Sequence, residues 1–257
     1  MNQTEFPEVE LPVIKGKDFP IEDFGAVPGG EVSNTKAIND AVRAASQAGG
    51  GRVVVPAGIW LTGPVELLSH VELHVEKGGL LLFHKIDEEY PLIRSNYEGE
   101  TRIRATSPIH AFEQTDIAIT GEGVIDGNGQ LWRMVKSMKM TANQWDKLVK
   151  SGGVVAPGGD GPHWFPSEGS LKGHQEANVD PDAPDWKEQA KKYFDYHRPV
   201  MVSLVRCKRV LIEDITLQNS PAWNLHPLFC EHLTLKNAKI RNPWFAQNGD
   251  GLDLESC

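Results

Sequence analysis

The amino-acid sequence predicts an all-β protein built as a right-handed parallel β-helix, with an N-terminal helix and an inserted lobe of helices and loops. Three observations support this prediction. The chain contains an internal repeat of 23 residues, the β-type runs between Val53 and Phe83 leave no room for crossover helices, and the repeat is interrupted between Leu131 and His197. A repeat of this length is typical of a solenoid.

The repeat is clearest when residues 208–230 are aligned with residues 231–253. At an offset of 23, the alignment pairs Val210 with Leu233, Ile212 with Leu235, Asp214 with Asn237, Leu217 with Ile240 and Asn219 with Asn242. Weaker copies occur in "SHVELHVEKGGLLLF" and "TDIAITGEGVIDGNG". A unit this short cannot bury its own apolar side, but copies stacked at about 4.8 Å per coil can. A β-sandwich would instead join its strands as hairpins with no fixed register.

The N-terminal part predicts one helix ahead of the coils. Residues 1–20 are Pro-rich, and we expect them to be irregular. The run "SNTKAINDAVRAASQAGGG" has an apolar stripe at helical spacing, with Ser33 or Asn34 as the cap and three glycines at its end. We therefore expect residues 21–257 to form a single β-helix domain.

Residues 130–198 interrupt the repeat, and we expect them to form an inserted lobe beside a groove. "TANQWDKLVKSGG" predicts a short helix with a capping box from Thr141 and Gln144, and "PDWKEQAKKYFDYH" predicts a second one. "VVAPGGDGPHWFPSEGS" reads as a long Gly/Pro loop. A disordered linker is the alternative, but the segment is rich in tryptophan, which favours a packed lobe.

Composition limits the partners of the chain. The 257 residues include 26 basic and 35 acidic side chains, a net charge of −9, which argues against a nucleic-acid partner. No run approaches 18 apolar residues, so we expect no membrane span. The three cysteines, Cys207, Cys230 and Cys257, fit neither a zinc site nor a disulfide framework, and one buried thiol per repeat is the main expectation, with a disulfide between neighbouring coils as the alternative.

Several motifs have a structural and a functional interpretation. The glycines of "GEGVIDGNG" lack the third glycine of a dinucleotide-binding turn, so we interpret them as a corner of the β-helix. His226 is either a packed histidine or part of a site. Trp223 is either a ladder aromatic or a platform on which a sugar stacks.

Asp250 and Asp253 are the strongest candidates for chemistry. They lie three residues apart in the Gly-rich run "NGDGLDLESC", where the structural alternative is a solvated edge or an Asx-type turn. Cleavage of a glycosidic bond needs one protonated carboxyl and one carboxylate. Carboxylates on neighbouring coils can be separated by roughly the 6.5–9.5 Å that leaves space for a water between them.

These motifs together resemble the pectin-degrading polygalacturonases, glycoside hydrolase family 28. The matching segments include "NTKAINDAV", "GGGRVVVPAGIW", "GVIDGNGQLW", "RPVMVSLVRCKRVLIEDITLQNSPAWNLHPLFCE" and "NGDGLDLESC". The resemblance implies a right-handed β-helix and hydrolysis with inversion. It also implies that Asp250 helps to activate the water and that Asn248 and Asp253 shape the site, with Gly249 where the family has threonine. No metal or cofactor is implied.

The resemblance also implies residues that this sequence does not contain. In the family, a coil carrying Asp-Asp follows about 20 residues later, then Gly-His-Gly and Arg-x-Lys, whereas only 7 residues follow Asp250 here. We therefore expect the chain to be an N-terminal portion that lacks the general acid, is inactive alone and is poorly soluble or self-associating because its last coil is uncapped.

The expected function is hydrolysis of pectic polysaccharide or oligosaccharide, either polygalacturonate or rhamnogalacturonan. The alternatives are a non-catalytic carbohydrate-binding β-helix and a pectate-lyase-like eliminase, which would need Ca²⁺ held by clustered acidic residues. The N-terminus lacks a basic region followed by an apolar one, so either the protein is not exported or a signal peptide has been removed. Of these two, we expect a secreted or periplasmic protein whose signal peptide has been removed.

Overall fold

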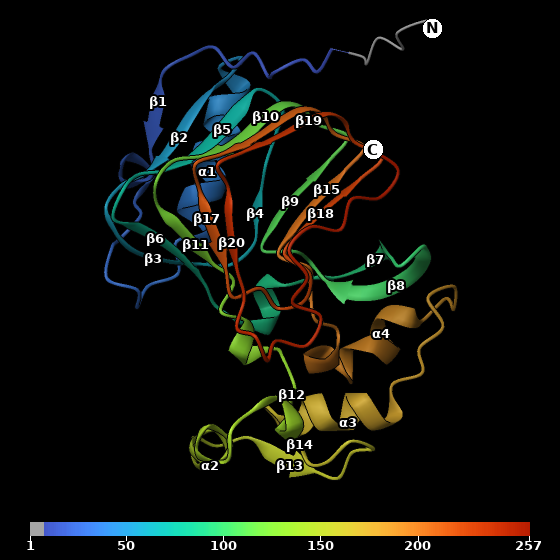
Figure 1. The fold of residues 1–257 in the computed structure, drawn as a ribbon. Coiled ribbons are helices and arrows are strands. Elements are labelled where there is room, and N and C mark those ends of the chain that lie inside the picture. Colours follow the sequence, from blue (N-terminus) through green and yellow to red (C-terminus); the bar gives the residue numbers. More distant parts are fainter. Residues whose placement is uncertain (1–7) are drawn as a thin grey trace, which may run out of the picture.

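The fold is a parallel β-helix whose coils each contribute strands to three sheets (Figure 1). A computed structural model describes residues 8–257. The six-stranded sheet has the order β1-β2-β5-β10-β16-β19, the five-stranded sheet β20-β17-β11-β6-β3, and the four-stranded sheet β18-β15-β9-β4. All neighbouring strands in these three sheets run parallel, which confirms the predicted fold class.

The strands of the coils are two to six residues long. Those of the six-stranded sheet are β1 Asp18–Pro20, β2 Gly51–Val55, β5 Val71–Val75, β10 Thr115–Thr120, β16 Lys208–Glu213 and β19 Glu231–Lys236. Those of the five-stranded sheet are β3 Gly58–Thr62, β6 Gly79–Phe83, β11 Val124–Asp126, β17 Thr216–Gln218 and β20 Lys239–Arg241. Those of the four-stranded sheet are β4 Val65–Glu66, β9 Ile109–Phe112, β15 Val202–Val205 and β18 Leu225–Leu228.

The strand register confirms the 23-residue repeat. Val210 pairs with Leu233, Ile212 with Leu235 and Leu217 with Ile240, as the sequence alignment predicts. The two weaker copies are confirmed as well, since they form β5–β6 and β10–β11 in the same stacks. The turn after β10, at Gly121, is a corner of the β-helix, as expected.

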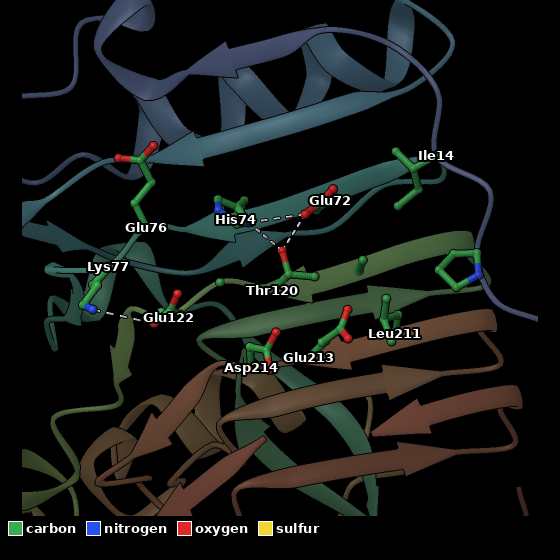
Figure 2. Close-up of a pocket in the computed structure, with 13 residues that line it drawn as sticks. Ile14, Glu72, His74, Glu76, Lys77, Thr120, Glu122, Leu211, Glu213 and Asp214 are labelled. Carbon is green, nitrogen blue, oxygen red and sulfur yellow. Dashed lines mark hydrogen bonds and ion pairs between the residues drawn. The ribbon is translucent and has the colours of Figure 1, made fainter. Parts of the chain in front are cut away.

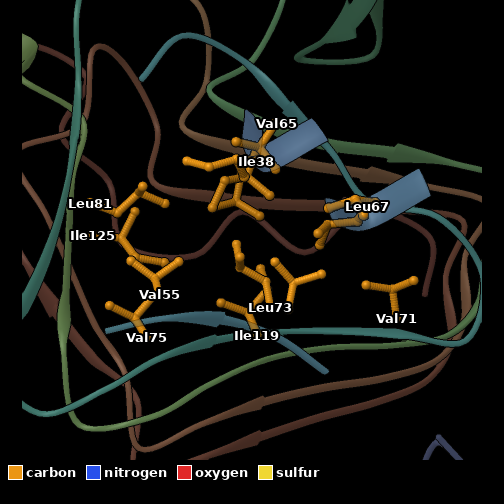
Figure 3. Packing of buried hydrophobic residues seen from close by; sticks show 14 of the residues in the cluster. Ile38, Val55, Val65, Leu67, Val71, Leu73, Val75, Leu81, Ile119 and Ile125 are labelled. Atoms are coloured by element: carbon orange, nitrogen blue, oxygen red, sulfur yellow. The ribbon is translucent and has the colours of Figure 1, made fainter. Parts of the chain in front are cut away.

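The core consists of apolar side chains that point into the coils and stack from one coil to the next. In the six-stranded sheet, Val53, Leu73, Ile119 and Ile212 occupy successive positions of one such ladder, and each is at most 1% exposed. Figure 3 shows Leu73 and Ile119 beside Val55, Val75, Leu81 and Ile125. This ladder explains why a 23-residue unit is stable only when it is stacked.

Helix α1 (Thr35–Gln47) covers the first coils, and it is preceded by the 3-10 helix η1 (Ile21–Phe24). The predicted apolar stripe of α1 is buried: Ile38 and Ala41 are fully inaccessible and pack into the main core. The side chain of Asn34 accepts from Val27 N–H at 2.7 Å instead of capping the helix.

The expectation that residues 1–20 are irregular is wrong in one respect. Residues 1–7 lie outside the described range, and residues 18–20 form β1, which pairs with β2. The intervening residues cross the outside of the six-stranded sheet, where Glu10 N–H donates to His232 Nδ1 at 3.1 Å and Val13 N–H donates to Asp116 Oδ1 at 3.0 Å. The N-terminal segment therefore ties several coils together.

The inserted lobe contains the two predicted helices. Helix α2 (Ala142–Lys150) begins with the capping box of Thr141 and Gln144, and α4 (Trp186–Lys191) is followed by η5 (Phe194–Tyr196). The other short elements in and near this region are η2 Asp87–Glu89, η3 Gly129–Leu131, η4 Ser137–Lys139 and strand β12 Val135–Lys136.

The segment expected to be a Gly/Pro loop is more regular than predicted. It contains strands β13 (Val154–Ala156) and β14 (His163–Phe165), and Ser167 caps a further helix, α3 (Glu168–Glu176). The sequence pattern did not predict this helix, because it contains glycines, which have a low helix propensity. A Cβ at Gly173 would lie 2.3 Å from the Tyr196 Cβ, so the glycine allows η5 to pack closely against α3.

An antiparallel hairpin, β7 (Leu92–Tyr97) and β8 (Glu100–Ala105), was not expected from the sequence. It leaves the coils between β6 and β9 and lies near the lobe (Figure 1). Cys207 and Cys230 are buried as expected, Cys257 is exposed, and all three are free thiols. Within residues 8–257, no helix has both the length and the apolar character needed to cross a bilayer.

Candidate functional site

The candidate site lies along the outer edge of the four-stranded sheet, where residues 250–255 run beside β18. Isolated parallel bridges join Leu225 to Leu252 and Leu228 to Glu255, and Asn224 N–H donates to the Asp250 carbonyl at 2.9 Å. The "NGDGLDLESC" run therefore begins the next coil, in the same stack as β15 and β18. This placement brings Asp250 and Asp253 beside Trp223 and His226.

The two aspartates have different environments. The side chain of Asp250 is exposed, whereas that of Asp253 is half-buried and its Oδ2 has no hydrogen-bond partner among the described residues. Burial, followed by the negative charges of Asp250, Glu255 and Glu98, raises the pKa of Asp253 to about 6. In mildly acidic solution Asp253 therefore holds a proton, and one carboxyl group of the pair is neutral.

His226 lies beneath these carboxyl groups, on β18. Its ring is 1% exposed, and Nε2 lies 2.8 Å from Glu255 Oε2. Nδ1 is buried with no partner within residues 8–257. His226 is therefore packed and hydrogen-bonded, which is one of the two interpretations that the sequence left open. In this conformation the ring can act on a ligand only through Glu255.

Trp223 is packed in this structure. The indole is 7% exposed, it stacks on Tyr97 with ring centroids 3.8 Å apart, and it contacts His226 edge-on at 5.2 Å. One face of the indole is therefore covered by the hairpin, so that a sugar cannot stack there unless Tyr97 moves.

Asn248 is held in place by Arg198, which is half-buried. The Nη2 group of Arg198 donates to Asn248 Oδ1 at 2.8 Å, and Nη1 donates to the carbonyls of Gln247 at 3.0 Å and Pro221 at 3.2 Å. Gly249, where the family pattern has threonine, is explained by packing: a Cβ there would lie 2.7 Å from the Ala246 Cβ.

Sequence reasoning missed the residues that surround this site from outside the repeat. Tyr97, Glu98 and Arg104 come from the hairpin, and Arg198 comes from the end of the lobe. The guanidinium group of Arg104 lies 3.5 Å from the centroid of the Tyr97 ring and donates to the Arg198 carbonyl. No repeat or motif pointed to these positions, because only the folded chain brings them to the site.

A groove of the described residues lies elsewhere, on the outer face of the six-stranded sheet. It encloses about 690 Å³ and is lined by acidic side chains, among them Glu72, Glu122, Glu213 and Asp214 (Figure 2). None of the residues predicted for the site lines it. Its negative charge is also a poor match for an anionic polysaccharide.

The chain is similar in sequence to known proteins. The sequence model of glycosyl hydrolases family 28 matches residues 137–257. The chain is 30% identical over 244 residues to a protein named "Probable polygalacturonase" from Vitis vinifera, covering 91% of this chain and 39% of that protein. It is 28% identical over 247 residues to an exo-poly-alpha-D-galacturonosidase from Dickeya chrysanthemi, covering 93% of this chain and 38% of that one.

A solved structure gives the same result. The fold matches that of a hyperthermoactive exopolygalacturonase from Thermotoga maritima with a TM-score of 0.68 at 28% identity, over 95% of this chain and 51% of the other. The chain thus spans about two fifths of the length of the two curated relatives. These matches make the chain similar to the glycosyl hydrolases of family 28.

Proposed function

We propose that the protein containing this chain hydrolyses glycosidic bonds of pectic polysaccharide, polygalacturonate or rhamnogalacturonan, with inversion at the anomeric carbon. The match to the family 28 sequence model and the names of the relatives, polygalacturonase and exo-poly-alpha-D-galacturonosidase, support the substrate class. The observation that carries the proposal is a pair of carboxyl groups, Asp250 exposed and Asp253 half-buried with its pKa raised to about 6, on the coil edge beside β18. Inverting hydrolysis of a glycoside requires a carboxylate that activates water, and the exposed carboxyl group of Asp250 can take this role; the general acid is a separate carboxyl group.

The proposal gives each residue a role. Asp250 accepts a proton from the attacking water, because its exposed carboxylate can reach a bound substrate. Asp253 and Asn248 shape the site next to it, and Asn248 is oriented by its bond to Arg198. His226 and Trp223 support the site from below, His226 by its contact with Glu255.

The general acid is proposed to lie outside residues 1–257. The family pattern places an aspartate pair about one coil after Asp250, and this sequence has none there. Hydrolysis is therefore proposed for a protein of the relatives' length, and residues 1–257 alone are expected to give no turnover. Export from the cytoplasm is part of the same proposal, because pectic polysaccharide is an extracellular substrate.

The test measures release of reducing ends from polygalacturonate and from rhamnogalacturonan by the protein of the relatives' length, with NMR of the first anomer released. Asp250→Asn should reduce kcat by about 10³-fold or more, because it removes the base. Asp214→Asn is the matched control: it makes the same chemical change at an exposed corner, where asparagine tolerates the positive φ of 61°. Inversion predicts a first product with the anomeric configuration opposite to that of the bond cleaved.

Two other outcomes would replace the proposal. Binding of pectic oligosaccharides without turnover in the longer protein would indicate a non-catalytic carbohydrate-binding β-helix. Unsaturated product ends that depend on added Ca²⁺ would indicate an eliminase. Turnover by residues 1–257 alone would contradict the placement of the general acid.

A further inference from the structure

The chain contains two Asn-Gly pairs, and the fold holds them differently. One is Asn128–Gly129, at the corner that follows β11, and the other is Asn248–Gly249, where the run beside β18 begins. In such a pair the glycine has no side chain to hinder attack of its amide nitrogen on the asparagine side chain. Both asparagines are half-buried and have a positive φ, 50° for Asn128 and 56° for Asn248. Differences between the two pairs therefore come from their surroundings.

The first pair is protected by the coil. The N–H group of Gly129 donates to the Asn219 carbonyl at 2.8 Å, and Gly129 is buried. The Oδ1 atom of Asn128 accepts a hydrogen bond from the neutral side-chain amide of Gln130. The nitrogen that would attack must first leave its hydrogen bond, so we expect this pair to react slowly.

The second pair has a free nucleophile and a polarised amide. Among residues 8–257, no group accepts a hydrogen bond of normal geometry from the N–H of Gly249, which is half-buried. The Nη2 group of Arg198 donates to Asn248 Oδ1 at 2.8 Å. Its positive charge draws electron density away from Asn248 Cγ and stabilises the negative charge that develops on Oδ1 when a nucleophile attacks that carbon.

We propose that Asn248–Gly249 is a site of spontaneous deamidation, promoted by Arg198. The Gly249 nitrogen forms a bond to Asn248 Cγ, the bond between Cγ and Nδ2 breaks, and Nδ2 leaves as ammonia with the Gly249 amide proton. The product is a cyclic imide. Water then opens the ring, either at Cγ to give aspartate or at the backbone carbonyl carbon of residue 248 to give isoaspartate. Water is the only other reactant.

Either product changes the candidate site. A carboxylate takes the place of an amide next to Arg198, with which it can form a charge-assisted hydrogen bond, and the site that already holds Asp250 and Asp253 gains a negative charge. Isoaspartate also lengthens the main chain by one carbon atom just before Asp250. This inference does not depend on the proposed function, because the reaction needs no substrate.

The test follows both pairs in the same folded protein during incubation at neutral pH, by mass spectrometry of tryptic peptides. The peptides that begin at Ala105 and at Asn242 carry one Asn-Gly pair each. We expect Asn248 to deamidate at least about fivefold faster than Asn128, because only the second pair must give up a hydrogen bond of Gly129. In urea the two rates should converge, and Asn248→Gln should remove the reaction at position 248.

Arg198→Lys tests the promotion, because lysine keeps the charge and loses the planar fork. It should slow deamidation at Asn248 and leave the rate at Asn128 unchanged. Arg94→Lys is the matched control: Arg94 is exposed on the hairpin, 5.1 Å from the ring of Trp186, and the change should affect neither rate. If Arg198→Lys also accelerates Asn128, the coil has opened, and the wild-type rates in the folded state and in urea decide.

Two results would overturn the inference. Equal rates for Asn248 and Asn128 in the folded protein, or a rate at Asn248 well below its rate in urea, would mean that the fold protects both pairs. Faster deamidation of Asn248 in a folded Arg198→Lys variant would show that the arginine shields the amide instead of activating it.

Discussion

The outer faces of the six-stranded and four-stranded sheets are built by the same repeat, but their carboxyl groups have different environments. On the six-stranded face, Asp116 is 4% exposed and forms two hydrogen bonds of 2.7 Å with Arg209. On the four-stranded face, Asp253 is half-buried beside other carboxyl groups, and its Oδ2 has no described partner. Hydrogen bonds from Arg209 hold the pKa of Asp116 near 2, whereas burial raises that of Asp253 to about 6.

This difference indicates that the two faces have different roles. Paired charges between stacked coils stabilise the solenoid, because each carboxylate is solvated by its partner. Unpaired and partly buried polar groups cost stability, and proteins tend to retain them where a ligand or a reaction uses them. The comparison thus supports the four-stranded face as the functional one. Four substitutions test the difference between the two faces or define it more closely.

The largest effect is expected for Asp116→Asn, which removes the charge that Arg209 neutralises. The change in pKa from 3.8 to about 2 corresponds to a loss of about 2 kcal/mol of unfolding free energy at pH 7. The melting temperature should fall by about 4–8 °C. Asp214→Asn is the control and should change it by less than about 1 °C.

The pH dependence gives an independent check on Asp116. A lowered carboxyl pKa stabilises the fold above the unfolded value of 3.8, and this contribution is lost as the pH falls through about 2. Urea unfolding of the wild type should therefore weaken between about pH 4 and pH 2 by more than that of Asp116→Asn. Identical slopes in the two proteins would mean that Asp116 is not a stabilising carboxylate.

The next effect is expected for Gly173→Ala in the lobe. The new Cβ would lie 2.3 Å from the Tyr196 Cβ, and the net loss should be about 1–2 kcal/mol after the gain in helix propensity. Hydrogen exchange should show the loss in α3 and η5, with little change in the coils. At Gly169 the nearest atom is the flexible end of Asp195, so Gly169→Ala should cost less.

Asp253→Asn should have the opposite sign. A carboxyl group whose pKa is raised in the folded state destabilises the fold at a pH above that pKa. The loss of unfolding free energy develops as the pH rises from about 4 to about 6. Asparagine does not titrate, so the variant should be about 1 kcal/mol more stable at pH 8 and equal to the wild type at pH 4, allowing for the partial exposure of this side chain. A variant that is less stable at pH 8 would show that Asp253 has a structural partner.

The smallest effect is expected for Arg52→Gln, on the six-stranded face. Arg52 makes two hydrogen bonds to Asp18, at 2.9 and 2.8 Å, but both side chains are exposed. The loss should be no more than about 0.5 kcal/mol and should shrink in 1 M salt. A loss as large as that of Asp116→Asn would mean that pairing alone, without burial, accounts for the stability of this face.

The candidate site was predictable from the sequence only in part. Asp250, Asp253 and Asn248 stand in a Gly-rich run that a repeat and a family pattern both single out, and their position beside β18 follows from the coil register. The burial of His226 and Trp223 was not predictable, because it depends on the hairpin and on Glu255. Whether these residues act in hydrolysis remains a prediction.

The sequence by itself determined the coils of this protein. In the last two coils each paired residue lies 23 positions before its partner, so that apolar periodicity and turn residues are enough to specify the stack of Val210 on Leu233. Only the tertiary structure decided the hairpin, α3 and the pocket between the hairpin and the lobe. Tyr97, Arg104 and Arg198 meet there through contacts between segments up to about 100 residues apart, and no local pattern encodes such contacts.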